Sequence, residues 1–284
     1  MIESSSDIWD SICDLNNHKY EFRLLGKDKD IPVLLAEDYF KEPDKIAEFL
    51  REGQWWTNGY NKDDNVIRPG KSLHFHPEMH TWFAEPLIQP LASVLGLKEV
   101  QIGQVYGNCF NGNMELSDIH SCFPHTDFTN FDPTVSDQIA FNINLTKSDN
   151  VMTGFYSFNN LKSRLDYSWN DNMAEEEFFF EMKNSLKEDA TWFHIDHYGP
   201  YRLEETIEIG YNTIIAYPTH FLHAPYIKSD WFTDTDRLTL AGFINTSPED
   251  LDFEQKHLDD VSYAWEFFHL DKIHNYHPKK TTPR

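Results

Sequence analysis

Four polar residues follow one another along the chain in an order that fits metal chemistry: His125 and Asp127, then His223, and finally Arg237. Two imidazoles and one carboxylate can hold an Fe(II) ion on one face and leave its remaining coordination positions open. An arginine placed after the second histidine can bind the far carboxylate of an acidic cosubstrate through two parallel hydrogen bonds. The order therefore predicts an iron site that activates oxygen with the help of an acidic cosubstrate.

The first pair has the spacing that a β-strand requires, because side chains at positions i and i+2 of a strand point to the same side. His125 and Asp127 lie in the aromatic segment FPHTDFTNF, which we predict to be a strand. Two later His-x-Asp triplets fall in a predicted helix beyond Arg237, and a third lies too close to His223 to leave room for the strands between them. These competing triplets are His194/Asp196, His257/Asp259 and His269/Asp271.

The third ligand has two candidates, His220 and His223, which would face opposite sides of a strand. The segment FLHAPYI around His223 is typical of a strand, whereas Pro-Thr-His before it is typical of a turn, so we favour His223. Arg237 opens RLTLAGFIN, and Thr239 at position i+2 shares its face and can add a hydroxyl group. The alternative for Arg237 is a salt bridge to one of the many acidic side chains.

Composition indicates one large domain with a sizeable core. The chain has 284 residues, 40% of them hydrophobic, with 22 Phe, 13 Tyr and 8 Trp. The net charge of −23 argues against nucleic acid and anionic membrane surfaces as partners, since both require basic protein surface. No apolar run approaches the ~20 residues of a membrane span.

Cysteine content and the N-terminal sequence predict a cytoplasmic protein. Three cysteines, Cys13, Cys109 and Cys122, form neither an even set nor a C-x-x-C motif, so we expect no disulfide framework and no zinc–thiolate site. The N-terminal sequence MIESSSDIWD has no basic region followed by an apolar one, so no signal peptide is expected.

Residue patterns predict a mainly β protein with helices, organised as a double-stranded β-helix (jelly roll). Residues 1–98 would support the core with a strand at 31–40 and helices at 41–53 and 78–96, and residues 1–30 are weakly patterned. Residues 99–246 would form the core, interrupted by an acidic helical insertion at 160–190, and 247–284 a C-terminal helical extension. We predict core strands near 100–109, 123–129, 137–145, 151–157, 191–197, 204–210, 212–217, 221–227 and 237–245.

Three sequence blocks resemble the 2-oxoglutarate/Fe(II)-dependent dioxygenase superfamily, nearest to its prolyl-4-hydroxylase-like branch. FPHTDF (123–128) is similar to the metal-binding strand of that superfamily. MTGFYSF (152–158) is similar to a Gly-Gly-Thr-x-Phe-Tyr segment, although Met152 and Thr153 depart from the double glycine. YNTIIAYPTHFLHAPYI (211–227) and then RLTLAGFIN resemble the distal histidine strand and the Arg-x-Ser/Thr pair.

The resemblance implies a hydroxylase that binds Fe(II) through His125, Asp127 and His223. Arg237 and Thr239 would bind the distal carboxylate of 2-oxoglutarate. The superfamily also implies that a C–H bond is oxidised by O2 with release of succinate and CO2. A carboxylate at Asp127 favours hydroxylation over chlorination, because related halogenases have a small residue there. Tyr106 and Asn142 are candidates to face the cosubstrate, or else are satisfied polar groups of the core.

The sequence leaves the substrate and two other functional classes open. The substrate could be a small molecule, an amino acid or a protein side chain. The protein could instead be a non-catalytic cupin-like or β-sandwich binding protein, or a metal-dependent enzyme that does not use 2-oxoglutarate. Segments 54–77, 110–121 and 160–190 could cover the mouth of the site, and the C-terminal helix could pack on the core or form a homodimer contact. Candidates for contact with the substrate, or else for ordinary packing and surface, are Trp55, Trp56, Tyr60, His74, His76 and Trp169. In the C-terminal helix the candidates for packing or dimer contact are Trp265, Phe267 and Phe268.

Overall fold

The structure is a computed structural model of the chain. The residues that it describes are 19–53, 56–57, 71–74, 100–110, 124–127, 139–163, 170–171, 173–175, 177–178, 197–198, 200–227 and 231–246. The predicted helices at 78–96 and beyond Ser247 lie outside these ranges, as do the three competing His-x-Asp triplets.

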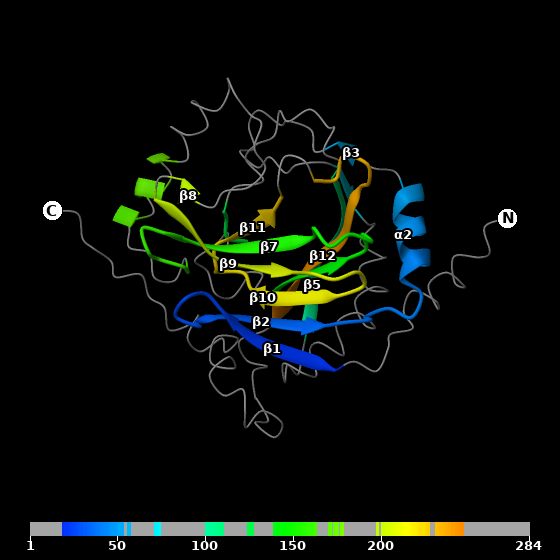
Figure 1. Cartoon of the computed structure of the whole chain (residues 1–284), viewed down its shortest axis with the longest axis horizontal. Coiled ribbons are helices and arrows are strands. Elements are labelled where there is room, and N and C mark those ends of the chain that lie inside the picture. Colours follow the sequence, from blue (N-terminus) through cyan, green and yellow to red (C-terminus); the bar gives the residue numbers. More distant parts are fainter. Residues whose placement is uncertain are drawn as a thin grey trace.

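Two antiparallel sheets make up the described part of the protein (Figure 1). The large sheet has the strand order β1-β2-β10-β6-β12-β5-β4-β3, and the small sheet has the order β11-β7-β9-β8. The strands are β1 (Tyr20–Leu25), β2 (Ile31–Ala36), β3 (Trp56–Thr57), β4 (Lys71–His74), β5 (Val100–Phe110), β6 (Ile139–Asn144), β7 (Met152–Phe158), β8 (His197–Tyr198), β9 (Tyr201–Glu208), β10 (Ile214–Pro218), β11 (His223–Tyr226) and β12 (Arg237–Thr246).

The connectivity is that of a double-stranded β-helix, as the sequence predicts. β5, β6, β10 and β12 form the centre of the large sheet, while β7, β9 and β11 form the small one. Residues 124–127 extend the small sheet through an antiparallel bridge between His125 and His223. The chain therefore passes back and forth between the two sheets, and residues remote in sequence become neighbours across the interior.

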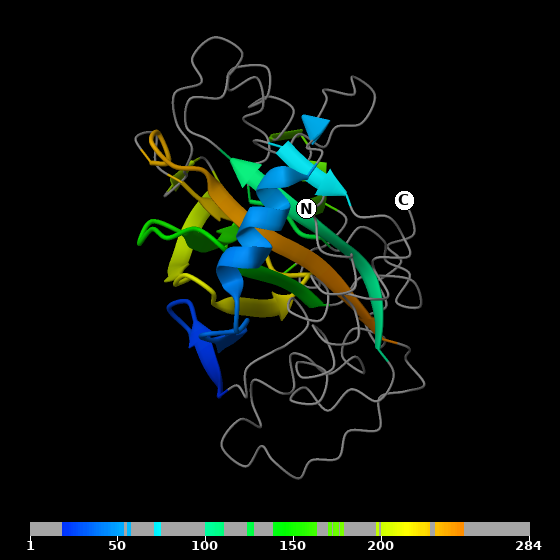
Figure 2. The ribbon, with the colours of Figure 1, turned by 90° about the vertical axis from the view of Figure 1, so that its right-hand side faces the viewer.

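The N-terminal segment is more strand-rich than predicted, since β1 and β2 add to one edge of the large sheet and β4 and β3 to the other. The predicted helix at 41–53 is confirmed as α2 (Pro43–Glu52), which begins at a proline and ends before Gly53. It buries one apolar face and lies in front of the large sheet when the molecule is turned (Figure 2). Among the described residues, no helix combines the length and apolar character needed to cross a membrane.

The main core lies between the sheets, and a second apolar cluster covers the back of the small sheet. Tyr156, Phe158 and Tyr201 belong to this second cluster, and Phe178 from the predicted insertion packs against it. The Tyr201 hydroxyl also donates to Glu175 Oε1 at 2.9 Å. Within the insertion, residues 160–163 form a turn and isolated bridges, and the described residues between 170 and 178 are helical. Ala174 and Phe178 pack against the second cluster, whereas the site described below lies between the sheets.

Candidate metal centre

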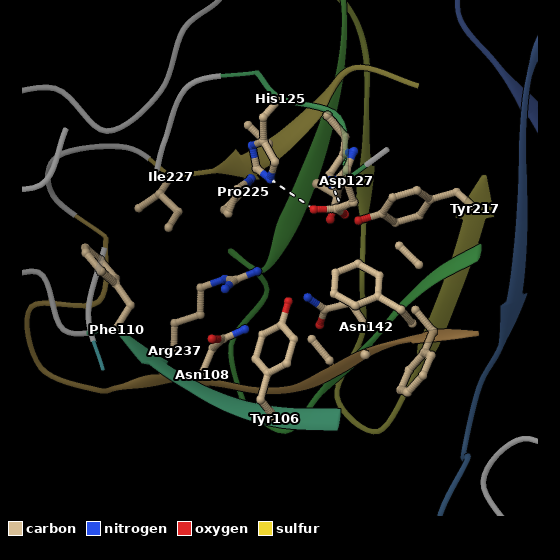
Figure 3. Close-up of a pocket in the computed structure, with 18 residues that line it drawn as sticks. Tyr106, Asn108, Phe110, His125, Asp127, Asn142, Tyr217, Pro225, Ile227 and Arg237 are labelled. Carbon is tan, nitrogen blue, oxygen red and sulfur yellow. Dashed lines mark ion pairs between the residues drawn. The ribbon is translucent and has the colours of Figure 1, made fainter. Parts of the chain in front are cut away.

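The pair His125 and Asp127 meets His223, from a distant part of the chain, at one end of a cavity, and Figure 3 labels the first two. One potential ligand atom from each of His125, Asp127 and His223 lies within 4.8 Å of the others. His223 Nε2 is 3.1 Å from Asp127 Oδ2, and His125 Nε2 is 3.7 Å from Asp127 Oδ1. The structure thus brings together the three residues that the sequence singles out as metal ligands.

Backbone hydrogen bonds fix the three residues relative to one another. His125 N donates to His223 O, and His223 N donates to His125 O, each at 2.9 Å. Asp127 N donates to Thr219 O at 3.1 Å. The strand predicted at 123–129 is a single bridge within the described residues 124–127, and this bridge is enough to place both histidines on adjacent backbones.

The hydrogen bond that His223 makes through Nδ1 leaves its Nε2 atom facing the Asp127 carboxylate. Its Nδ1 lies 3.0 Å from the carbonyl oxygen of Phe221, so this nitrogen carries the proton and donates. In a neutral imidazole, Nε2 is then an acceptor, and it faces the acceptor oxygen of Asp127 in a site where both side chains are largely buried. A second proton or a metal ion must lie between them for this contact to be favourable.

One pair of donor atoms has the spacing expected for two ligands of one metal ion, while the distance from His125 Nε2 to Asp127 Oδ1 is wider at 3.7 Å. Ligands at about 2.1 Å from a metal and at right angles to each other have donor atoms roughly 3 Å apart. The Nε2–Oδ2 separation of 3.1 Å matches this value. A carbonyl that fixes the outer nitrogen of a ligating histidine is also the usual arrangement around protein-bound metals.

His220, the rival for the third position, belongs to a different environment. It is 3% exposed and belongs to neither the three-residue cluster nor the cavity lining. Burial lowers its pKa from 6.5 to about 3, since no water remains to stabilise the imidazolium. His220 is thus a neutral core residue, and it lies in the turn before β11, as the sequence predicts, rather than on that strand.

A cavity of about 100 Å³ continues from the cluster toward the inner face of the large sheet. One water needs roughly 10–15 Å³ of such space, so the cavity can accept a ligand of several heavy atoms. His125 lies at its open side with 42% of its side chain exposed. Arg237 lies deep inside at 5% exposure, and its guanidinium group points into the cavity (Figure 3).

The register of the large sheet explains which polar residues share the cavity with Arg237. Ala241 on β12 pairs with Tyr106 on β5 and with Asn142 on β6, so these two side chains flank a small residue on the inner face. Both line the cavity, and their role toward a cosubstrate stays a prediction. The Asn142 Oδ1 atom is buried and has no hydrogen-bond partner among the described residues, so a polar ligand would satisfy it.

Thr239 differs from its expected place. It shares the face of Arg237 and Ala241 on β12 but is fully buried and is not among the residues that line the cavity. Its hydroxyl oxygen lacks a hydrogen-bond partner within the described part of the chain. Thr239 therefore lies beneath the cavity floor, where it can support Arg237 more readily than contact a ligand.

The sequence did not identify several residues that line the cavity, notably Asn108, Phe110 and Tyr217. Strand alternation could have found the first two, because they follow Tyr106 on the same face of β5. Asn108 Oδ1 accepts a hydrogen bond from Ser72 Oγ at 3.3 Å, which ties the cavity floor to β4. Nothing in the sequence around Tyr217 distinguishes it from an ordinary core tyrosine.

Residues 16–244 match a family described as "Family of unknown function (DUF6445)". The chain belongs to this family. A comparison with curated protein sequences finds no significant match for this DUF6445 member.

Solved structures with a similar fold include HygX from Streptomyces hygroscopicus, crystallised with nickel, 2-oxoglutarate and hygromycin B. It is 10% identical, with a TM-score of 0.44 over 87% of this chain and 88% of that one. The α-ketoglutarate-dependent carbocyclase SnoK is 11% identical, with a TM-score of 0.46 over 76% and 80%. A prolyl 4-hydroxylase from Phytophthora capsici is 12% identical, with a TM-score of 0.41 over 95% and 72%. Because these values are low, function must be inferred from the residues of the site itself.

Proposed function

We propose that this protein is an Fe(II)- and 2-oxoglutarate-dependent oxygenase that hydroxylates a C–H bond of a small molecule, an amino acid or a protein side chain. The observation that carries the proposal is the convergence of His125, Asp127 and His223 at one end of a cavity that also contains a buried arginine. A facial set of two histidines and one carboxylate leaves several metal positions open for other ligands.

Arg237 favours 2-oxoglutarate over other metal chemistry. The Arg237 guanidinium is buried and points into the cavity, and its fork of parallel N–H donors matches a carboxylate. Its position across the cavity from the three potential ligands suits a dicarboxylate that reaches both. A zinc hydrolase or a cupin isomerase would give this arginine no role.

Each residue would have a distinct task. His125, Asp127 and His223 would hold the metal, and the Phe221 carbonyl keeps the ring of His223 in the orientation that presents Nε2. Arg237 would bind and orient the distal carboxylate, with Tyr106 and Asn142 offering hydrogen bonds beside it. Bound iron and 2-oxoglutarate would together supply the oxidising power, with succinate and CO2 as coproducts.

The test is turnover of 2-oxoglutarate in the absence of a primary substrate. We expect the wild-type protein to form succinate only when Fe(II), O2 and 2-oxoglutarate are all present, and His223→Ala to abolish this. His220→Gln is the matched control, since His220 is a buried histidine of the same segment outside the cavity. Its succinate formation should equal that of the wild type.

Two outcomes would replace the proposal with one of its alternatives. Failure of the wild-type protein to bind Fe(II), together with no visible charge-transfer band on anaerobic addition of 2-oxoglutarate, would indicate a non-catalytic binding protein. Tight metal binding with no 2-oxoglutarate-dependent band and no succinate would indicate a metal enzyme of another class.

A further inference from the structure

Tyr217 lies opposite the metal-ligand cluster but comes from the other sheet. It is part of β10 in the large sheet, is 5% exposed, and lines the cavity. Figure 3 shows its side chain crossing from that sheet, with the hydroxyl group directed toward Asp127. Tyr217 therefore contacts the cluster of potential metal ligands through His223 without being one of those ligands.

The ring of Tyr217 is held firmly in place. It meets the imidazole of His223 edge to face, with centroids 4.7 Å apart and planes at 62°, and it meets Phe155 in the same way at 5.2 Å and 88°. Such pairs favour the edge-to-face arrangement of both rings. The hydroxyl group of Tyr217 is therefore directed by packing on two sides, and the His223 ring gains a second constraint besides its bond to Phe221.

Asp127 has a requirement that this hydroxyl can meet. A carboxylate that binds a metal through one oxygen leaves its other oxygen as a charged acceptor, and the Asp127 side chain is only 12% exposed. Buried acceptors of this kind are hydrogen-bonded, and a partner in that position fixes the orientation of the ligand. A phenolic hydroxyl can donate to a carboxylate, which is itself acceptor only.

We propose that Tyr217 is a positioning residue of the centre, which donates its hydroxyl hydrogen to the Asp127 oxygen that does not bind the metal. This inference rests on the proposed function, because it assumes that Asp127 is a metal ligand. Tyr217 would lock the carboxylate into one-oxygen binding and keep its second oxygen away from the open metal positions. The large sheet would thus set the geometry of ligands that the small sheet supplies.

The competing explanation is that Tyr217 is core packing whose hydroxyl group has no function. Tyr217→Phe separates the two, since it keeps the ring contacts to His223 and Phe155 and removes only the hydroxyl group. Tyr156→Phe is the control: Tyr156 is a fully buried tyrosine in the cluster on the back of the small sheet, away from the cavity.

The measurement is the dissociation constant of the full-length metal-free protein for Co(II), with the visible spectrum of the Co(II) complex as a second readout. We expect Tyr217→Phe to weaken Co(II) binding about 10–100-fold, as for other residues that orient metal ligands. The absorption bands should also shift, because the carboxylate changes its mode of binding. The metal-free variants should unfold at the same temperature as the wild type, and Tyr156→Phe should reproduce the wild-type constant and spectrum.

Two results overturn the inference and can be told apart. If Tyr217→Phe keeps the wild-type constant and spectrum, the hydroxyl group has no role at the centre, while the proposed function stands. If the wild-type protein itself takes up no Co(II), the metal centre and the role of Tyr217 both fall.

Discussion

Replacing Arg237 with glutamine is the sharpest test of how the cavity would recognise its cosubstrate. Arg237 is 5% exposed and, among the described residues that line the cavity, is the one with a permanent positive charge. Glutamine keeps a polar side chain of similar reach but removes the charge and the fork of donors. The distal carboxylate of 2-oxoglutarate would then enter a buried site without a cation.

The expected loss follows from the burial of this pair. Removing one partner of a buried ion pair typically costs about 3–5 kcal/mol, because the remaining charge stays desolvated. At about 1.4 kcal/mol per factor of ten, 2-oxoglutarate should bind about two to four orders of magnitude more weakly. Arg237→Lys should lose about tenfold or more, since it keeps the charge but gives up one of two charge-assisted hydrogen bonds, each contributing roughly 1.5 kcal/mol or more.

The assay is anaerobic titration of the metal-loaded protein with 2-oxoglutarate, followed by the KM for 2-oxoglutarate in succinate formation. Arg202→Gln is the matched control, because Arg202 is an exposed arginine on β9 outside the cavity. Metal affinity should be equal in all four proteins, since Arg237 is not a ligand. An Arg237→Gln variant that binds 2-oxoglutarate as tightly as the wild type would refute the assignment of this arginine.

Three further predictions concern the neighbourhood of the centre. Asp127→Gly should abolish succinate formation by removing a metal ligand, and full turnover in this variant would contradict the ligand set. Gly154→Ala should lower the free energy of unfolding by about 1–3 kcal/mol in urea titrations, because an added Cβ would lie 2.8 Å from the buried ring of Tyr156. His220 should make the protein acid-sensitive. Its pKa is lowered to about 3 by burial, so below the unfolded-state value near 6.5 the unfolded chain binds more protons than the folded one. Stability should therefore fall as the pH drops from 6.5 toward 3, by about 2 kcal/mol near pH 5, and His220→Gln should remove this part of the pH dependence.

The core strands and the potential ligands were predictable because local sequence determines them. β-Branched and aromatic runs between turn residues mark β5 to β7 and β9 to β12 to within a few residues. The His-x-Asp spacing and the turn-like Pro-Thr-His segment favour His125, Asp127 and His223 over His220, although residues 124–127 form a single bridge and not a strand. Chain order then excludes the competing triplets without any knowledge of the fold.

The remainder depends on pairing between distant strands, which a single sequence does not reveal. β1 (YEFRLL) alternates charged and apolar residues at a sheet edge, so its pattern is weak until β2 is known to lie beside it. Tyr217 faces the cavity only because β10 lies opposite β11 across the interior. Thr239 has the predicted face of β12 but is fully buried and does not line the cavity.

The backbone bridge between His125 and His223 also bears on how long the protein survives. It joins segments remote in sequence, so forming it closes a long loop at an entropic cost. A metal ion held by both imidazoles would bind only the folded chain, in which this bridge is formed. At a free concentration about one hundred times its dissociation constant, the ion would stabilise the folded chain by about 2.7 kcal/mol. If the proposed centre binds iron, metal supply would affect the resistance of the chain to proteolysis as well as its proposed activity.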